Sequence, residues 1–238
     1  MKVDILAMGA HPDDVELSCG GTLLTHVKMG KKVAIVDLTM GELGTRGTPE
    51  MRIEEANNAA AILGASVREN LGLKDGFIQN DEASLLKVVA AIRKFQPTIL
   101  LANAKYDRHP DHAMAATLAE RAAFLAGLKK IETHENGEPQ AAWRPTVVYH
   151  YIQSLDMVPD FVVNISDVFE EKMKAVLAFK SQFYDPNATE PNTFISSPEF
   201  LDFLKARAIN TGLPTGFKYA EGFQKNRFIG VNNLFDLV

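Results

Sequence analysis

The sequence predicts an α/β protein with a Rossmann-like, open and mostly parallel sheet that carries helices on both faces. The first half alternates short β-rich runs with longer helical patterns. The strand runs are continuously apolar rather than alternating, as expected for a parallel sheet buried on both sides. No repeat, low-complexity tract or shift in composition divides the chain. We therefore expect residues 1–238 to form a single domain.

The first half of the chain contains four strand–helix units. Thr48 followed by Pro49 is typical of a helix start, and Gly64 of a helix end. The expected strands cover residues 3–9, 32–38, 66–71 and 97–102, and the expected helices cover residues 15–29, 49–63, 82–95 and 111–126.

The second half is less regular. Residues 130–145 are polar and predict a loop. Strands are expected at 146–151 and 161–164, and helices at 167–179 and 198–211. A stretch rich in Pro and Asn, residues 184–192, separates these helices and is long for a compact domain. Such a segment often forms a lid or a subunit contact.

Composition excludes several classes of protein. With 46% hydrophobic and 23% charged residues, the chain is neither disordered nor a coiled coil. A formal charge of −5 gives no general attraction to nucleic acid or an acidic membrane. The apolar runs are too short for a signal peptide or a membrane span. Cys19 is the only cysteine, so we expect a cytoplasmic protein without a disulfide.

Two segments that follow expected strands carry histidine, proline and acidic residues. Residues 9–16 read GAHPDDVE after the first strand, and residues 106–112 read YDRHPDH after the fourth. Ligands of open α/β sheets bind at the carboxyl ends of the strands, where both segments lie. The two loops are therefore expected to face one another.

These loops predict a divalent metal site. His11 and Asp14, three residues apart in a turn before a helix, supply two ligands, and the second loop supplies a third. We favour His112 over His109, because the first helical turn fixes its direction. Two imidazoles and one carboxylate leave positions open for water and substrate, which is typical of a catalytic site.

The remaining polar residues of the loops predict acid–base chemistry. Asp13 and Asp14 are adjacent, so their side chains should diverge, leaving Asp13 free as a general base. His109 is expected to stabilise or protonate the reacting group. Asp111 is expected to accept the ring N–H of His109. Glu16 is expected either to cap the first helix or to orient a ligand histidine, and we favour the second role.

The two loop motifs resemble those of the zinc-dependent N-acetylglucosaminyl deacetylases of the LmbE/PIG-L family. Similarity extends over nearly the whole chain to segments of the branch that deacetylates N-acetylglucosaminyl L-malate in bacillithiol biosynthesis. These segments are Asp37-Leu-Thr39, Gly47-Thr48, Arg52-x-Glu54-Glu55, Lys180-Ser-Gln-Phe183 and Tyr219-Ala-Glu-Gly-Phe223. One departure is Phe200, at about the place where that branch often has a tyrosine.

The resemblance implies a small-molecule N-acetylated sugar as substrate and a homo-oligomer, such as a hexamer. It implies Zn²⁺ as the cofactor, although another divalent metal such as Fe²⁺ stays open. The zinc ligands would be His11, Asp14 and His112. Asp13 would activate water, His109 would act on the oxyanion or amine with Asp111 as its partner, and the acetyl group would leave as acetate. Arg52 is implied as a substrate contact, and Arg108 has a similar claim.

Alternatives remain open from the sequence. Within the family, a chitobiose, mycothiol-precursor or antibiotic-precursor deacetylase would carry the same motifs. Two histidines and one carboxylate also form the facial triad of non-haem Fe(II) oxygenases. A dinucleotide-binding module is disfavoured, because the first strand leads into Asp13 and Asp14 rather than into a glycine-rich loop. His150 is either a substrate contact or a hydrogen-bonded core residue.

Overall fold

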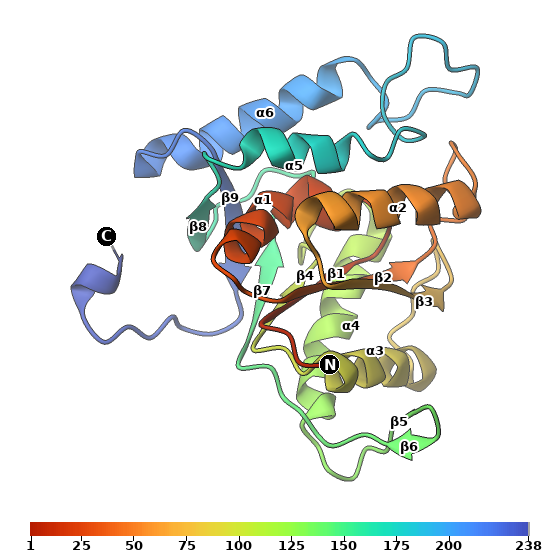
Figure 1. The fold of residues 1–238 in the computed structure, drawn as a ribbon, viewed down its shortest axis with the longest axis vertical. Coiled ribbons are helices and arrows are strands. Elements are labelled where there is room, and N and C mark those ends of the chain that lie inside the picture. Colours follow the sequence, from red (N-terminus) through yellow and green to blue (C-terminus); the bar gives the residue numbers. More distant parts are fainter. Residues whose placement is uncertain (238) are drawn as a thin grey trace.

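A computed structural model describes residues 1–237 and shows a central seven-stranded sheet with the strand order β3-β2-β1-β4-β7-β9-β8 (Figure 1). The first five strands of that order are parallel, and β9 runs antiparallel to both β7 and β8. The strands are β1 (Ile5–Gly9), β2 (Val33–Thr39), β3 (Val67–Leu73), β4 (Ile99–Ala102), β7 (Val147–Tyr151), β8 (Phe161–Asn164) and β9 (Ala220–Lys225).

Helices cover both faces of the sheet (Figure 1). One face carries α1 (Asp14–Lys28), α2 (Pro49–Leu63), α5 (Phe169–Val176) and α6 (Glu199–Gly212), and the other carries α3 (Glu82–Phe95) and α4 (Pro110–Ala126). Two large apolar clusters fill the layers on either side, and β1 and β2 are buried along their whole length. The predicted fold class is therefore confirmed.

Local sequence signals explain the helix ends. The Thr48 side chain accepts a hydrogen bond from the Met51 amide at 3.3 Å, and Pro49 begins α2. Gly64 ends the same helix with a φ of 68°, a left-handed conformation that glycine adopts without strain.

The structure contains strands in two places where the sequence predicts none. The expected loop at 130–145 contains a small hairpin, β5 (His134–Glu135) and β6 (Glu138–Pro139), whose turn places Asn136 and Gly137 at positive φ. Strand β9 was not expected, because its sequence AEGFQK has no continuous apolar run. Short 3₁₀ segments, η1 (Leu213–Thr215) and η2 (Leu234–Leu237), complete the elements.

The strand order places a crevice between β1 and β4. The chain builds outward from β1 through β2 to β3, then returns to β4 on the other side of β1. In open α/β sheets this reversal opens a crevice at the carboxyl ends of the two strands. The loops after β1 and β4 both begin there. In the part of the chain that the structure describes, no helix has the length and apolar character needed to cross a bilayer.

Candidate active site

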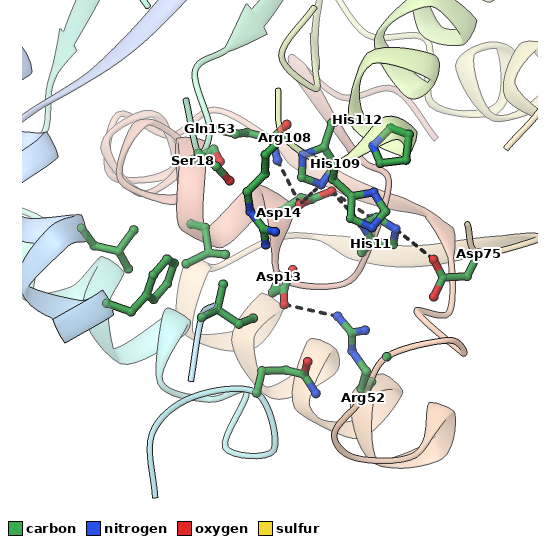
Figure 2. A pocket seen from close by; sticks show the side chains of 18 of the residues that line it. His11, Asp13, Asp14, Ser18, Arg52, Asp75, Arg108, His109, His112 and Gln153 are labelled. Carbon is green, nitrogen blue, oxygen red and sulfur yellow. Dashed lines mark hydrogen bonds and ion pairs between the residues drawn. The ribbon is translucent and has the colours of Figure 1, made fainter. Parts of the chain in front are cut away.

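The loops after β1 and β4 meet in a cavity of about 390 Å³ (Figure 2). The expectation that the two loops face one another is confirmed. The cavity is lined by Arg52 of α2 and by the candidate residues of the two loops other than Glu16 and Asp111. A segment from the C-terminal third of the chain forms an apolar wall with Ile195, Phe200, Phe203 and Leu204.

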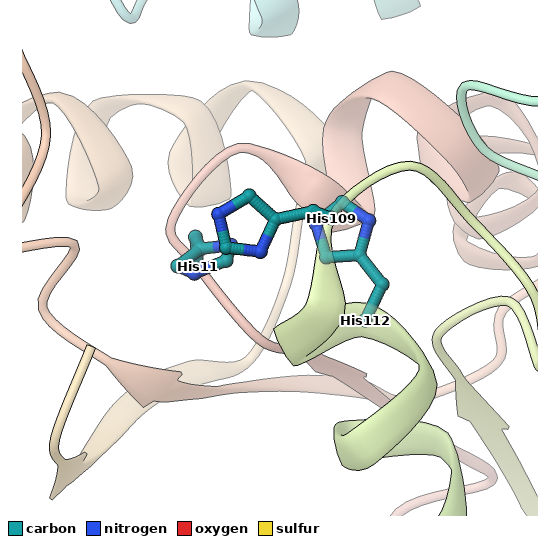
Figure 3. Close-up of side chains that lie close together, drawn as sticks. All are labelled: His11, His109 and His112. Atoms are coloured by element: carbon teal, nitrogen blue, oxygen red, sulfur yellow. The ribbon is translucent and has the colours of Figure 1, made fainter. Parts of the chain in front are cut away.

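The carboxylate of Asp14 lies between two imidazoles. Its Oδ2 is 3.6 Å from Nδ1 of His11, and its Oδ1 is 3.1 Å from Nε2 of His112. All three residues are buried. Ring nitrogens of His11, His109 and His112 also lie within 4.8 Å of one another, and Figure 3 shows the three imidazoles grouped at the start of α4. The three predicted metal ligands therefore come together.

The other ring nitrogen of each histidine meets a carboxylate. Nε2 of His11 is 3.1 Å from Asp75 and 3.3 Å from Asp111. Nδ1 of His112 is hydrogen-bonded to Asp107, whose second oxygen accepts the amides of Ser154 and Leu155. Metal-binding histidines usually donate their second N–H in this way, which fixes the tautomer and the ring orientation.

Amide side chains hold Asp14 in place. Asn103 donates to Oδ2 of Asp14 at 2.9 Å, and Gln153 donates to Oδ1 at the same distance. The side-chain oxygen Oε1 of Gln153 accepts from both the Asn103 side chain and the Ala104 amide. The Asp14 carboxylate is thereby oriented with one oxygen towards each of its two histidines.

Charge in this cluster favours a bound cation. Burial alone would lower the pKa of His112, but Asp14 and Asp107 raise it to about 9. Burial would raise the pKa of Asp14, yet the two histidines hold it well below its usual value. Two nitrogen donors and one carboxylate are a donor set that suits Zn²⁺. His11, Asp75 and Asp111 form a second close group, but here both carboxylates meet the ring nitrogen of His11 that faces away from Asp14.

Asp13 diverges from Asp14 as expected. It precedes α1 with a φ of 114°, and its Oδ2 is 3.2 Å from Nη2 of Arg52. Burial, opposed by Arg52, raises the pKa of Asp13 to about 7. Arg52 is only 4% exposed and also donates to the carbonyls of Pro12 and Gly41, so it is not a solvated surface cation.

The predicted pairing of Asp111 with His109 is wrong. Nδ1 of His109 accepts a hydrogen bond from the backbone amide of Asp111 at 3.3 Å, as an N-cap of α4. The Asp111 carboxylate turns instead to His11 and to the Gly76 amide, 2.7 Å away. Burial, together with the nearby histidines, lowers the pKa of His109.

The contacts of Glu16 and His150 decide two further expectations. Glu16 meets Arg68 at 2.5 Å rather than a ligand histidine, so that prediction is wrong. Arg68 also binds Asp37 through two hydrogen bonds. His150 is fully buried, and its ring nitrogens meet the Asn103 carbonyl and Glu120. It is a hydrogen-bonded core residue.

Arg108 lies at the mouth of the cavity. Its guanidinium carbon is 4.3 Å from the ring centre of Phe194, which belongs to the segment between α5 and α6. Figure 2 shows the Arg108 side chain directed over Asp13. Within residues 1–237 it makes no ion pair, so its charge is available to a ligand.

Four functional residues were missed by the sequence analysis. They hold the proposed ligands, and each follows a strand at the carboxyl edge of the sheet: Asp75, Asn103, Asp107 and Gln153. Position immediately after a parallel strand was the signal that could have found them.

A model of the family described as GlcNAc-PI de-N-acetylase (PIG-L) matches residues 6–123, which include both loops. The chain belongs to the PIG-L family. The match contains every predicted catalytic, substrate and metal-binding residue of this PIG-L protein. Strands β7, β8 and β9 and the apolar wall of the cavity lie beyond it.

The PIG-L protein is similar to several known proteins. A conserved protein of known structure from Thermus thermophilus is 35% identical, with a TM-score of 0.86 and coverage of 97% of this chain and 98% of that one. Diacetylchitobiose deacetylase of Thermococcus kodakarensis is 29% identical, over 92% of this chain and 82% of the relative. A probable N-acetyl-α-D-glucosaminyl L-malate deacetylase of Bacillus cereus is 25% identical, over 76% and 84%. A 4-oxalmesaconate hydratase of Pseudomonas putida is 28% identical, over 74% and 73%.

Proposed function

We propose that this protein is a zinc-dependent hydrolase that removes the acetyl group from an N-acetylglucosaminyl small molecule. The observation that carries the proposal is the Asp14 carboxylate held between His11 and His112, with Asp13 beside it in the same cavity. Membership of a family described by its de-N-acetylase activity supports the reaction type.

His11, Asp14 and His112 would hold the metal. A divalent cation bound there polarises the acetamide carbonyl and lowers the pKa of water. Asp75 and Asp111 hold His11, while Asp107 holds His112, so the donor atoms keep their direction without a ligand present. Asp111 is thus proposed to act through His11.

Asp13 is proposed to accept a proton from the attacking water. It is buried at the cavity, and Arg52 holds one of its oxygens at 3.2 Å. His109 lines the same cavity, with Nδ1 occupied by a backbone amide. We therefore assign the Nε2–H of His109 to stabilising the oxyanion, and we assign to Asp13 the transfer of the proton taken from water to the departing amine.

The substrate class is proposed to be a conjugate with an acidic group, such as N-acetylglucosaminyl L-malate of bacillithiol biosynthesis. Arg108 lines the cavity mouth and makes no ion pair among residues 1–237, and planar guanidinium groups bind carboxylates through two parallel hydrogen bonds. Arg52 also lines the cavity, where its guanidinium already holds Asp13. A direct contact of Arg52 with the substrate would be a second role for this residue, besides its ion pair with Asp13.

The test compares acetate release from three substrates, with and without added zinc. N-acetylglucosaminyl malate should be hydrolysed faster than N-acetylglucosamine and N,N′-diacetylchitobiose. The variant Arg108→Met should lose that preference while still hydrolysing the neutral sugars. Equal rates on all three substrates would reject the acidic conjugate. No acetate from any of them would reject the deacetylase.

A second chemistry is represented by the hydratase among the relatives. The same purified protein should therefore be incubated with 4-oxalmesaconate. Hydration of this substrate without acetate release from any sugar would favour the hydratase over the deacetylase.

A further inference from the structure

The carboxylate of Glu221 is inserted against the backbone of α1. Glu221 belongs to β9 and is only 4% exposed. Its Oε1 accepts the Gly21 amide at 2.9 Å, and its Oε2 accepts the Thr22 amide at 2.7 Å. In a regular α-helix those amides donate to the carbonyls four residues earlier. A side chain from a distant strand therefore binds the middle of this helix.

In a regular helix the Gly21 amide would donate to the Leu17 carbonyl, and this carbonyl is bound by two cationic side chains. The Leu17 carbonyl, four residues before Gly21, accepts from Nζ of Lys172 at 3.1 Å and from Nη2 of Arg207 at 2.8 Å. Lys172 also meets Glu221 at 2.6 Å, and both side chains are almost fully buried. Side chains inserted into the hydrogen-bond ladder of a helix bend it and fix its path.

Gly21 allows α1 to lie close to the segment that follows β8. A Cβ atom on Gly21 would lie 2.8 Å and 2.9 Å from side-chain carbons of Ile165, so only glycine fits without a shift. At Gly20 the nearest contact would be an ordinary 3.6 Å. The helix is therefore pressed against the segment that follows β8 at the position where Glu221 binds it.

This cluster is connected to the catalytic cavity by two routes. Leu17 and Ser18 line the cavity, and Asp14 lies one helical turn before them. Arg207 also donates to the backbone carbonyl of Gln153, and the Gln153 side chain donates to Asp14 at 2.9 Å. A shift of α1 at Leu17 would thus move Asp14 directly and through Gln153.

We propose that Glu221 and Lys172 form a positioning pair that fixes the first turn of α1 and so aims Asp14 into the metal site. The pair touches neither the cavity nor the proposed ligands, and it acts through Leu17 and Arg207. A buried ion pair is not by itself a device for stability, because its desolvation opposes its attraction. The inference rests on the proposed function, in which Asp14 is a metal ligand.

The experiment measures the dissociation constant of Co²⁺ by competition with a chromophoric chelator. Glu221→Gln keeps the side-chain shape but replaces one acceptor oxygen by an amide donor. This variant should weaken Co²⁺ binding about 10-fold, because loss of a group that orients a metal ligand typically lowers metal affinity by at least that factor. The double variant Glu221→Gln with Lys172→Met removes both charges and should be equally weak, even if it is more stable.

Arg93→Met is the matched control. Arg93 is 3% exposed and binds four acceptors near the C-terminal end of α4, away from the cavity. It should lower the melting temperature while leaving Co²⁺ binding unchanged. Equal binding by wild type and both Glu221 variants, or an equal loss in Arg93→Met, overturns the positioning role. A wild-type protein that binds no Co²⁺ overturns the proposed metal site as well.

Discussion

Replacing Asp13 by Asn separates the proposed base from the proposed ligands. Asn is nearly isosteric and tolerates the left-handed φ of 114° at this position. The Asp13 carboxylate meets Arg52 rather than a histidine of the cluster, so the change should leave the proposed metal ligands in place and zinc should still bind. Loss of a general base should lower kcat by about 10²–10⁴-fold. This corresponds to about 3–5 kcal/mol in the activation barrier.

The assay combines acetate release at saturating zinc with zinc titration of the same preparation. Asp13→Asn should bind one zinc per chain and turn over slowly. His112→Ala serves as the contrast, since it should lose both zinc and turnover. An Asp13→Asn enzyme with near wild-type kcat would remove Asp13 as the base, and one without zinc would make Asp13 part of the metal site.

Further predictions concern protons, orientation and packing. In the metal-free protein the pKa of His112 is about 9 and the pKa of His11 is also raised well above its usual value, so zinc must displace a proton from each histidine at neutral pH. Affinity should therefore rise with pH by up to about 10-fold per unit for each displaced proton, with proton release seen by calorimetry in buffers of different ionisation enthalpy; a flat affinity contradicts this. Gln153→Leu removes a hydrogen bond to the carboxylate ligand and should weaken zinc binding about 10-fold in a chelator competition, and unchanged binding would show that Gln153 does not orient it. Gly21→Ala should destabilise the fold by about 1–3 kcal/mol in urea denaturation, because its Cβ would overlap Ile165. Gly20→Ala should be neutral or stabilising, and equal effects of the two glycine changes would contradict the packing argument.

The parallel half of the fold was predictable because each of its elements has a strong local signal. The strand β1 and its neighbours are apolar throughout, and α2 has both its cap and its terminal glycine. The two loops could be placed together because parallel strands end at one edge of the sheet. The meeting of His11 with His112 followed from that rule, together with the direction that the first turn of the following helix gives to His112.

Strand β9 could not be predicted because its stability comes from distant partners. Its Glu221 is a charge that a strand would normally exclude from the core. It is tolerated because Lys172 and two amides of α1 satisfy it, and these groups are 49 to 200 residues away in the chain. No pattern within six residues contains that information.

The error at Asp111 has a similar origin. Nearness in sequence favoured His109 as its partner, two residues away. Helix geometry instead directs the Asp111 amide to His109, leaving the carboxylate to reach His11 and the Gly76 amide. The assignment of Asp75 to His11 likewise depends on a loop 64 residues away.

X-ray absorption at the zinc edge, on the purified protein and on Asp14→Asn, tests the metal centre most directly. The wild-type spectrum should show one zinc per chain with two imidazole nitrogens, a carboxylate oxygen and solvent oxygen in its first shell. The variant should bind zinc far more weakly. A protein without zinc affinity, or a spectrum with no imidazole contribution, would contradict the arrangement of His11, Asp14 and His112 as a metal site.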